Sequence, residues 1–440
     1  MKTKIYPGFA SGEIIVPSSK SVVHRLLICA CLCNTNLTIN DVDINDDILA
    51  TVSCLRNLKA KINIENNKIE ICKGIDIDNI LDEVIMDANF SASTLRFLIP
   101  LSSKLSKKVI FKGHESLIAR PNDIYKSLYE KENKIFDIKN NEICIEGALE
   151  SHEFVIDGSI SSQFISGLLF YLPLVSNDSV IKVTNEFSSK PYVLLTISIL
   201  KEFGIDINIT NNLIYIKGSQ SYKASNKEIY AEGDYSQAAY FFCLGAIGGK
   251  IYINNLKHDS LQGDKKIITL LEQVNAFVKT TADGYYLEKQ NLKLIDNEFD
   301  LLDTPDLAPI LLVLLSMVSG SSIVKNVRRL KFKESNRILA MKEELEKLDI
   351  DIECSLDENE IKLLGKKEII LNKDIEVSSH NDHRIFMALT ILGVSIKGTG
   401  KLIIDGTECI TKSYPKFLDD LHKLNILTEK VNDWKYWKGF

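Results

Sequence analysis

The sequence lacks the long apolar segments that membrane-spanning or secreted chains carry. No uninterrupted apolar run reaches the roughly 18 residues that cross a bilayer. The first 17 residues also contain no apolar core of the signal-peptide type. We therefore expect a cytoplasmic protein without a membrane partner.

An excess of basic residues is also missing. The chain has 53 Lys and Arg against 59 Asp and Glu, which gives a formal net charge of −6 at pH 7. Nucleic-acid binding usually depends on a basic domain that displaces counterions from phosphates. The composition therefore argues against a nucleic-acid partner, and any site for an anion has to be local.

Cysteine pairs and cofactor motifs are missing too. The nine cysteines include no C-x-x-C pair and lie mostly in apolar runs, which is typical of reduced core residues. His380 and His383 share one turn, but no third metal ligand matches them in the sequence. Since the glycine-rich nucleotide motifs are absent as well, we expect no metal and no organic cofactor.

What the chain does contain is a repeat. A short β-branched strand, a turn of small or acidic residues and an apolar helix recur six times, with turns that begin at positions 17, 87, 157, 232, 303 and 379. An amphipathic helix and a hairpin follow in most copies, as in 121–132 and 136–147, where Asn140-Asn141 has the composition of a two-residue turn. The apolar helices lack a polar face, so we expect α/β modules with buried helices and outer sheets.

Length and composition favour two large lobes. A chain of 440 residues is too long for one ordinary core, and 45% hydrophobic residues can fill sizeable cores.

Basic residues stand at the starts of several predicted helices, where they oppose the helix dipole. They are Lys20, His24 and Arg25 in the first copy, Arg96 in the second, and His383 and Arg384 in the sixth, with Arg120, Lys190, Lys333, Arg337 and Lys412 in linker turns. Polar donors in similar turns are Ser161, Ser162, Gln163 and Ser189. Each cation alone is more often solvated or ion-paired, but together they predict a ligand with several negative charges.

Two acids, Asp306 in TPDLAP and Glu334 in FKESNR, accompany these cations. A carboxylate beside a cationic cluster can act as a general acid or base. An acid at a helix start is also the ordinary N-cap. For Asp306 the catalytic and the capping roles therefore both stay open.

The chain contains, in this order, the motifs PSSKSVVHR, STLRFLIP, ARP, DGSISSQF, SKPY, TPDLAP, FKESNRI, NDHRIFMAL and ITKSYP. Over nearly its whole length it thereby resembles the EPSP synthase family, the 3-phosphoshikimate 1-carboxyvinyltransferases. The resemblance implies a two-lobed, inside-out α/β barrel with three repeated units in each lobe. It also implies lobes of 20–230 and of 1–19 plus 231–440, with the active site in the cleft between them, and we expect a monomer.

The resemblance implies transfer of the enolpyruvyl group of phosphoenolpyruvate to the 5-hydroxyl of shikimate 3-phosphate, by addition and elimination, in aromatic amino acid biosynthesis. The implied catalytic residues are Asp306, Glu334, Lys20 and Lys412, and the division of acid and base among them stays open. The implied contacts of shikimate 3-phosphate are Lys20, Ser21, Arg25, Ser161, Ser162, Gln163, Ser189, Asp306 and Lys333. Those of phosphoenolpyruvate are Lys20, Ala92, Arg96, Arg120, Gln163, Arg337, Arg384 and Lys412.

Three positions depart from the family pattern. Ala92 stands where glycine is usual, and its methyl group narrows the phosphoenolpyruvate site, so we hypothesise that it keeps substrate binding but disfavours the longer inhibitor glyphosate. Phe90 replaces a polar residue, which indicates, as an alternative, a remodelled site with weaker substrate binding. Asn336 replaces a common aspartate and removes a charge near Arg337.

Two other functions stay open. The sister enolpyruvyl transferase that acts on UDP-N-acetylglucosamine shares the fold, but it typically has a cysteine in the loop that reads GHESLIARP here. A noncatalytic paralogue would keep the cations but would have no need of both Asp306 and Glu334. We expect the aromatic segment 433–440 to pack on the last helix.

Overall fold

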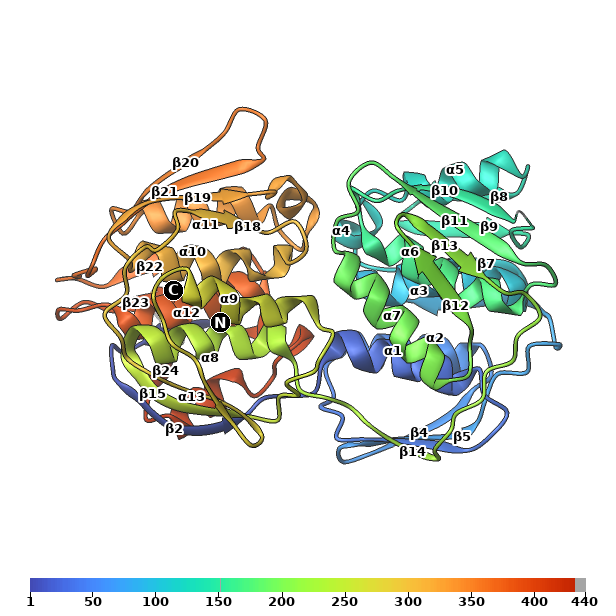
Figure 1. Ribbon diagram of the computed structural model, residues 1–440, viewed down its shortest axis with the longest axis horizontal. Coiled ribbons are helices and arrows are strands. Elements are labelled where there is room, and N and C mark those ends of the chain that lie inside the picture. The colour runs from blue at the N-terminus through green and yellow to red at the C-terminus, as the bar shows by residue number, and fades with distance from the viewer. Residues whose placement is uncertain (151, 432–440) are drawn as a thin grey trace, which may run out of the picture. The chain divides into compact units, whose positions relative to one another are not determined.

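Six four-stranded sheets correspond to the six copies of the repeat. The computed structural model describes residues 1–150 and 152–431, and within them the strands form six sheets of four strands (Figure 1). The chain divides into two compact units, Ser18–Glu232 and Met1–Pro17 with Gly233–Phe440, and each unit has three of the sheets. The division falls after residues 17 and 232, where the resemblance led us to expect 19 and 230.

The unit Ser18–Glu232 alternates strands and helices. Its elements are α1 (Lys20–Cys31), β3 (Leu37–Asn40), α2 (Asp46–Asn57), β4 (Lys61–Glu65), β5 (Lys68–Lys73), β6 (Leu81–Asp87), α3 (Ala92–Leu105), β7 (Ser106–Lys112), α4 (Glu115–Ile118), α5 (Asp123–Lys131), β8 (Ile135–Lys139), β9 (Glu142–Glu146), β10 (Glu153–Asp157), α6 (Ser162–Tyr171), η1 (Leu172–Leu174), β11 (Ser179–Thr184), α7 (Lys190–Glu202), β12 (Ile207–Thr210), β13 (Leu213–Ile216) and β14 (Glu228–Tyr230).

The other unit repeats the scheme. Its elements are β1 (Lys2–Ile5), β2 (Ala10–Ile15), α8 (Tyr235–Gly248), β15 (Gly249–Asn254), η2 (Gly263–Lys266), α9 (Ile267–Glu272), β16 (Lys279–Thr281), β17 (Gly284–Glu288), β18 (Glu298–Asp300), η3 (Pro305–Leu307), α10 (Ala308–Ser316), β19 (Gly320–Lys325), η4 (Arg328–Phe332), α11 (Arg337–Glu346), β20 (Asp351–Cys354), β21 (Glu360–Gly365), β22 (Ile375–Val377), α12 (His383–Ser395), β23 (Leu402–Ile404), η5 (Thr407–Lys412), α13 (Phe417–Lys423) and β24 (Thr428–Val431).

The second copy shows how one sheet forms. Helix α3 returns the chain so that β7 pairs with β6 in parallel, and the hairpin of β8 and β9 completes the order β6-β7-β9-β8. The hairpin turn residues Asn140 and Asn141 have φ angles of 53° and 59°. This left-handed backbone is the conformation that a two-residue Asn-Asn turn was expected to take.

Two strands exchange partners between the first and the fourth copies of the repeat. Strand β2 leads into α1, but it pairs in parallel with β15 of the unit that contains α8. Strand β14 leads into α8, but it pairs with β3 of the unit that contains α1. Strand β1 likewise pairs with β23 and β24, so both N-terminal strands place residues 1–17 with the C-terminal half of the chain.

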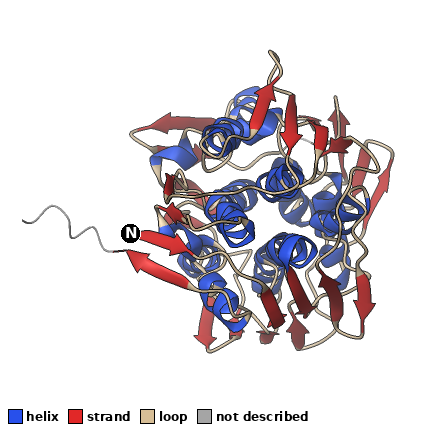
Figure 2. Ribbon diagram, turned by 90° about the vertical axis from the view of Figure 1, so that its left-hand side faces the viewer, coloured by secondary structure: helices blue, strands red, loops and turns tan. Residues whose placement is uncertain are grey.

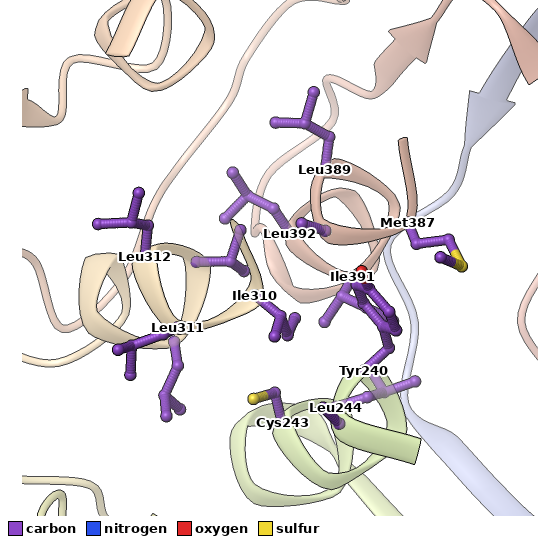
Figure 3. Close-up of a cluster of buried hydrophobic side chains, with 14 of the residues drawn as sticks. Tyr240, Cys243, Leu244, Ile310, Leu311, Leu312, Met387, Leu389, Ile391 and Leu392 are labelled. Atoms are coloured by element: carbon purple, nitrogen blue, oxygen red, sulfur yellow. The ribbon is translucent and has the colours of Figure 1, made fainter. Parts of the chain in front are cut away.

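The apolar helices form the cores of both units. In Figure 2 helices seen end-on lie inside a surrounding layer of strands. Helix α8 is buried from Tyr235 to Ile247, and its Leu244 lies in one cluster with Ile310 of α10 and Ile391 of α12 (Figure 3). The α/β fold with buried helices and outer sheets is therefore confirmed, and its physical cause is the lack of a polar helix face.

Two sequence expectations concern membranes and the chain end. The described residues contain no helix with both the length and the apolar composition that crossing a bilayer requires. The aromatic segment 433–440, expected to pack on the last helix, lies outside the described residues.

Candidate active site

In the unit Ser18–Glu232, predicted site residues gather at the first turns of the helices. Lys20 is the first residue of α1 and Ala92 the first of α3. Ser161 caps α6, since its hydroxyl accepts from the Gln163 backbone N–H at 3.3 Å. Ser189 precedes α7 with a left-handed φ of 54°, which is uncommon for a residue other than glycine.

Arg96 connects the second and third copies of the repeat. Its Nη1 donates to Oε1 of Gln163 at 3.0 Å and to the Ser161 hydroxyl at 3.4 Å. Its Nη2 donates to the carbonyl of Pro121 at 3.1 Å, next to Arg120. Gln163 in turn donates to the Ser93 hydroxyl at 3.0 Å. The structure therefore brings the predicted residues of α3, α6 and the Arg120 segment together.

Arg25 joins α1 to α7 in the same unit. Its guanidinium donates to the Thr196 hydroxyl at 2.8 Å and to the carbonyls of Ser21 and Tyr192. In the described chain the hydrogen bonds of Arg25 and Arg96 all go to neutral oxygens. Burial lowers the pKa of both guanidiniums to about 10, so both stay charged near neutral pH. These buried cations favour an anionic ligand.

Lys20 has a partner that the sequence analysis missed. Its Nζ lies 2.6 Å from Oδ2 of Asp47, in the first turn of α2. No motif marked Asp47, because the capping sequence around it looks like any helix start.

A chain of buried hydrogen-bonding side chains connects α1, α2 and α3. His24 Nδ1 is 2.7 Å from the Thr51 hydroxyl, and the Thr51 hydroxyl is 2.6 Å from the Thr94 hydroxyl. The Thr94 hydroxyl donates to the hydroxyl of Ser91, which caps α3. Burial lowers the pKa of His24 well below its usual value, and Lys20 and Arg25 add to this effect. His24 is therefore neutral and connects α1 to the start of α3.

The remaining predicted residues of this unit have simple positions. Ser21 is the second residue of α1, Ser162 is the first of α6, and Arg120 follows α4 in a buried position.

In the other unit, Asp306 is the centre of a cationic cluster. Its Oδ1 lies 3.1 Å from Lys333 Nζ and 2.8 Å from Arg337 Nη1, and its Oδ2 lies 3.2 Å from Arg384 Nη2. Burial by itself would raise the pKa of Asp306, but Arg384, Lys333 and Arg337 hold it well below the usual range. Burial also lowers the pKa of Lys333. In the described structure this carboxylate accepts from cations and caps no helix.

Besides Asp306, Arg337 binds two further acids, Glu334 and Asp382. Its Nη2 lies 2.5 Å from Oε2 of Glu334, and its Nε lies 2.8 Å from Oδ2 of Asp382. Burial opposes the charge of Arg337, but Asp382, Glu334 and Asp306 raise its pKa above the usual value. Sequence reasoning did not select Asp382, although the NDHR motif contains it. Its carboxylate also caps α12 by accepting from the Arg384 backbone N–H at 2.9 Å.

Lys412 and Asn336 complete this group. Lys412 Nζ donates to the carbonyl of Asn381 at 3.1 Å, directly before Asp382. Asn336 caps α11 by accepting from the backbone N–H of Leu339. The departure at Asn336 therefore keeps a helix cap without the aspartate charge.

One group of metal-ligand types lies beside the Asp382 turn. Glu343, Glu344 and His380 place possible ligand atoms within 4.8 Å of one another. Glu344 already accepts from the Ser378 backbone N–H, Lys347 and His380. These contacts satisfy the buried carboxylate, so we interpret the group as a support of the turn.

The predicted site residues are thus divided between the two units. Lys20, Ser21, Arg25, Ala92, Arg96, Arg120, Ser161, Ser162, Gln163 and Ser189 belong to Ser18–Glu232, and Asp306, Lys333, Glu334, Arg337, Arg384 and Lys412 belong to the other unit.

Comparisons with known proteins agree in pointing to one family. A family model described as EPSP synthase (3-phosphoshikimate 1-carboxyvinyltransferase) matches residues 7–421. A 3-phosphoshikimate 1-carboxyvinyltransferase of Clostridium beijerinckii is 37% identical, with 98% of both chains covered. One of Clostridioides difficile is also 37% identical, with 99% of both chains covered. The structure of EPSP synthase from Acinetobacter baumannii has a TM-score of 0.77 at 21% identity, over 98% of this chain and 100% of that chain, which supports the same fold.

Proposed function

Since the chain belongs to the EPSP synthase family, we propose that it transfers the enolpyruvyl group of phosphoenolpyruvate to the 5-hydroxyl of shikimate 3-phosphate. The products are 5-enolpyruvylshikimate 3-phosphate and phosphate, in the biosynthesis of chorismate and aromatic amino acids. Full-length relatives at 37–39% identity bear the name of this activity.

The observation that carries the proposal is the arrangement of charges. One unit contains buried arginines whose hydrogen bonds go to neutral oxygens, and the other contains an ionised Asp306 among three cations. Each of the two substrates has a phosphate and a carboxylate, so binding both requires many cations. Proton transfer also requires a carboxylate of the protein. The combination supports an acid–base transferase for anions more than a binding protein.

The addition step uses Asp306 as the base. Asp306, helped by Lys20, accepts the proton of the 5-hydroxyl while that oxygen bonds to the enol carbon of phosphoenolpyruvate. Glu334 donates a proton to the methylene carbon, which becomes a methyl group. Because Asp306 is ionised, it can accept the proton of the 5-hydroxyl once the anionic groups of the substrates attract Lys333 and Arg384 away from it.

The elimination step restores the double bond. The bond from the former enol carbon to the phosphate oxygen breaks, and phosphate leaves with the bonding electrons. The methyl group returns one proton to an enzyme carboxylate, which gives the enol ether. Arg120, Arg337, Arg384 and Lys412 stabilise the departing phosphate and the carboxylate of the substrate.

We propose the following contacts for the two substrates. The shikimate 3-phosphate contacts are Lys20, Ser21, Arg25, Ser161, Ser162, Gln163, Ser189, Asp306 and Lys333, and the phosphoenolpyruvate contacts are Lys20, Ala92, Arg96, Arg120, Gln163, Arg337, Arg384 and Lys412. The family resemblance supports this assignment, as does the cationic character of both groups.

We also propose that the enzyme acts as a cytoplasmic monomer without a cofactor. All nine cysteines are free thiols and most are buried, which supports a reducing compartment.

The test is release of inorganic phosphate from phosphoenolpyruvate in the presence of a chelator. Release that requires shikimate 3-phosphate is the expected result. Release that requires UDP-N-acetylglucosamine instead would assign the sister activity, and binding of both substrates without turnover would indicate a noncatalytic paralogue.

A further inference from the structure

The ring of Phe90 stacks on a histidine from another segment. Phe90 lies in the turn between β6 and α3, two residues before Ala92, and its ring is 4.1 Å from that of His114, with 24° between the ring planes. His114 lies between β7 and α4. The two turns also share a main-chain hydrogen bond, from the His114 N–H to the Asn89 carbonyl at 2.7 Å.

The contact between the turns is close. A Cβ atom on Gly113 would lie 3.2 Å from the Asn89 carbonyl oxygen and 3.2 Å from Leu117. Asn89 itself has a left-handed φ of 50°, a conformation that asparagine adopts more readily than most residues. Side chains and backbone together therefore hold the β6–α3 turn against the start of α4.

His114 also starts the helix that leads to Arg120. Its Nδ1 accepts from the backbone N–H of Ser116 at 3.2 Å, which caps α4. This helix has four residues, Glu115–Ile118, and so short a helix has little stability without contacts from its surroundings. Arg120 follows directly, and its backbone N–H donates to the carbonyl of Leu117 at 3.2 Å.

The segment after α4 is fixed on its other side as well. The Asn122 side chain donates to the Arg120 carbonyl at 3.0 Å, and Arg96 donates to the Pro121 carbonyl at 3.1 Å. On the N-terminal side, the cap by His114, its stack with Phe90 and its main-chain bond to Asn89 support α4, together with the burial of Leu117 and Ile118.

We propose that Phe90 is a positioning residue for Arg120: through its stack on His114 it holds α4, and thereby the guanidinium that binds phosphoenolpyruvate. The inference rests on the proposed function and deepens it, because it assigns a role to a position where this chain departs from its family. Phe90 then supports substrate binding, whereas the sequence alone suggested a site with weaker binding.

The first experiment compares Phe90→Ala with Phe90→Tyr. Loss of an aromatic stack changes an equilibrium by about two- to tenfold, so Phe90→Ala should raise the KM for phosphoenolpyruvate by that factor. The KM for shikimate 3-phosphate should stay unchanged, and Phe90→Tyr should behave as the wild type because it keeps the ring. Tyr215→Ala is the matched control, since it removes a 45% exposed aromatic residue of the same unit outside these segments.

The second experiment reports on α4 without turnover. Amide hydrogen exchange of residues 116–120 should be faster in Phe90→Ala and in His114→Ala than in the wild type. The double variant should exchange no faster than His114→Ala, because that single variant already removes both the stack and the cap. Unchanged exchange in Phe90→Ala would overturn the positioning role, whether or not the wild type releases phosphate. If the wild type released no phosphate but Phe90→Ala still made amide exchange of residues 116–120 faster, the proposed function would be wrong, while the role of Phe90 in holding α4 would be supported.

Discussion

Arg337 Nε lies 2.8 Å from Oδ2 of Asp382, and both side chains are almost completely buried, with exposed fractions of 1% and 0%. The remaining nitrogens of Arg337 bind Glu334 and Asp306. One guanidinium therefore orients both acids to which we assign proton transfer. Removing one partner of a buried ion pair leaves the other charge without compensation, which costs more than the pair itself contributes.

We predict that Arg337→Met lowers the free energy of unfolding by about 3–5 kcal/mol, because Asp382 stays buried and loses its main cation. Urea denaturation measures the change. Lys342→Met on the same helix is the control, since this lysine pairs with Glu346 at the surface and such pairs contribute at most about 1 kcal/mol. Equal destabilisation by the two substitutions would contradict the prediction.

Asp306→Asn should lower kcat by about 10²- to 10⁴-fold, because an amide cannot accept the proton of the 5-hydroxyl. The phosphate-release assay measures this change. Asp349→Asn is the control, since Asp349 is an exposed acid in a left-handed turn of the same unit. A variant at position 306 that kept more than a tenth of the wild-type kcat would rule out the assigned base.

The same substitution should change how stability depends on pH. The pKa of Asp306 is held well below its ordinary value of 3.8 in the folded protein, so its ionised form stabilises the fold above that value. This contribution is lost as the pH falls through the folded pKa. The wild type should therefore be more stable than Asp306→Asn at pH 7, and the difference in melting temperature should shrink below about pH 4. A difference that stayed constant down to pH 2 would be inconsistent with the pairing.

Ala92→Gly should make the enzyme more sensitive to glyphosate. Ala92 is the first residue of α3, beside the Ser91 cap, and an extra methyl group against a ligand costs about 1–3 kcal/mol. We expect the inhibition constant to fall about five- to a hundredfold in Ala92→Gly, with little change in the KM for phosphoenolpyruvate. Inhibition curves for both proteins measure this, and identical curves would falsify the hypothesis.

The resemblance and the repeat pattern anticipated most of the fold. The lack of a polar face on the apolar helices predicted their burial, because a helix without a continuous polar side has no face for water. The Asn140-Asn141 pair predicted a left-handed hairpin turn for a similarly local reason. Both features depend on residues that are close in sequence, so a single chain shows them directly.

The partners of the site residues could not be predicted in this way. Asp306 was open to capping or catalysis, and only the fold brings Arg384, 78 positions away, to its carboxylate. The role of Asp382 depends on Arg337, 45 positions away, and that of Asp47 on Lys20. The contact of Phe90 with His114 likewise joins two separate turns, and the sequence did not indicate it.

What the sequence by itself determined is therefore local: the six copies of strand, turn and buried helix, the Asn140-Asn141 turn, and the residue types that stand at the helix starts. The tertiary structure decided which cation neutralises which acid and which strand joins which sheet, as in the exchange of β2 and β14. The physical reason is the sequence separation over which each kind of interaction acts. Helix and strand periodicities act over a few residues, whereas ion pairs and strand pairings form between segments that only the packing of the repeats brings together.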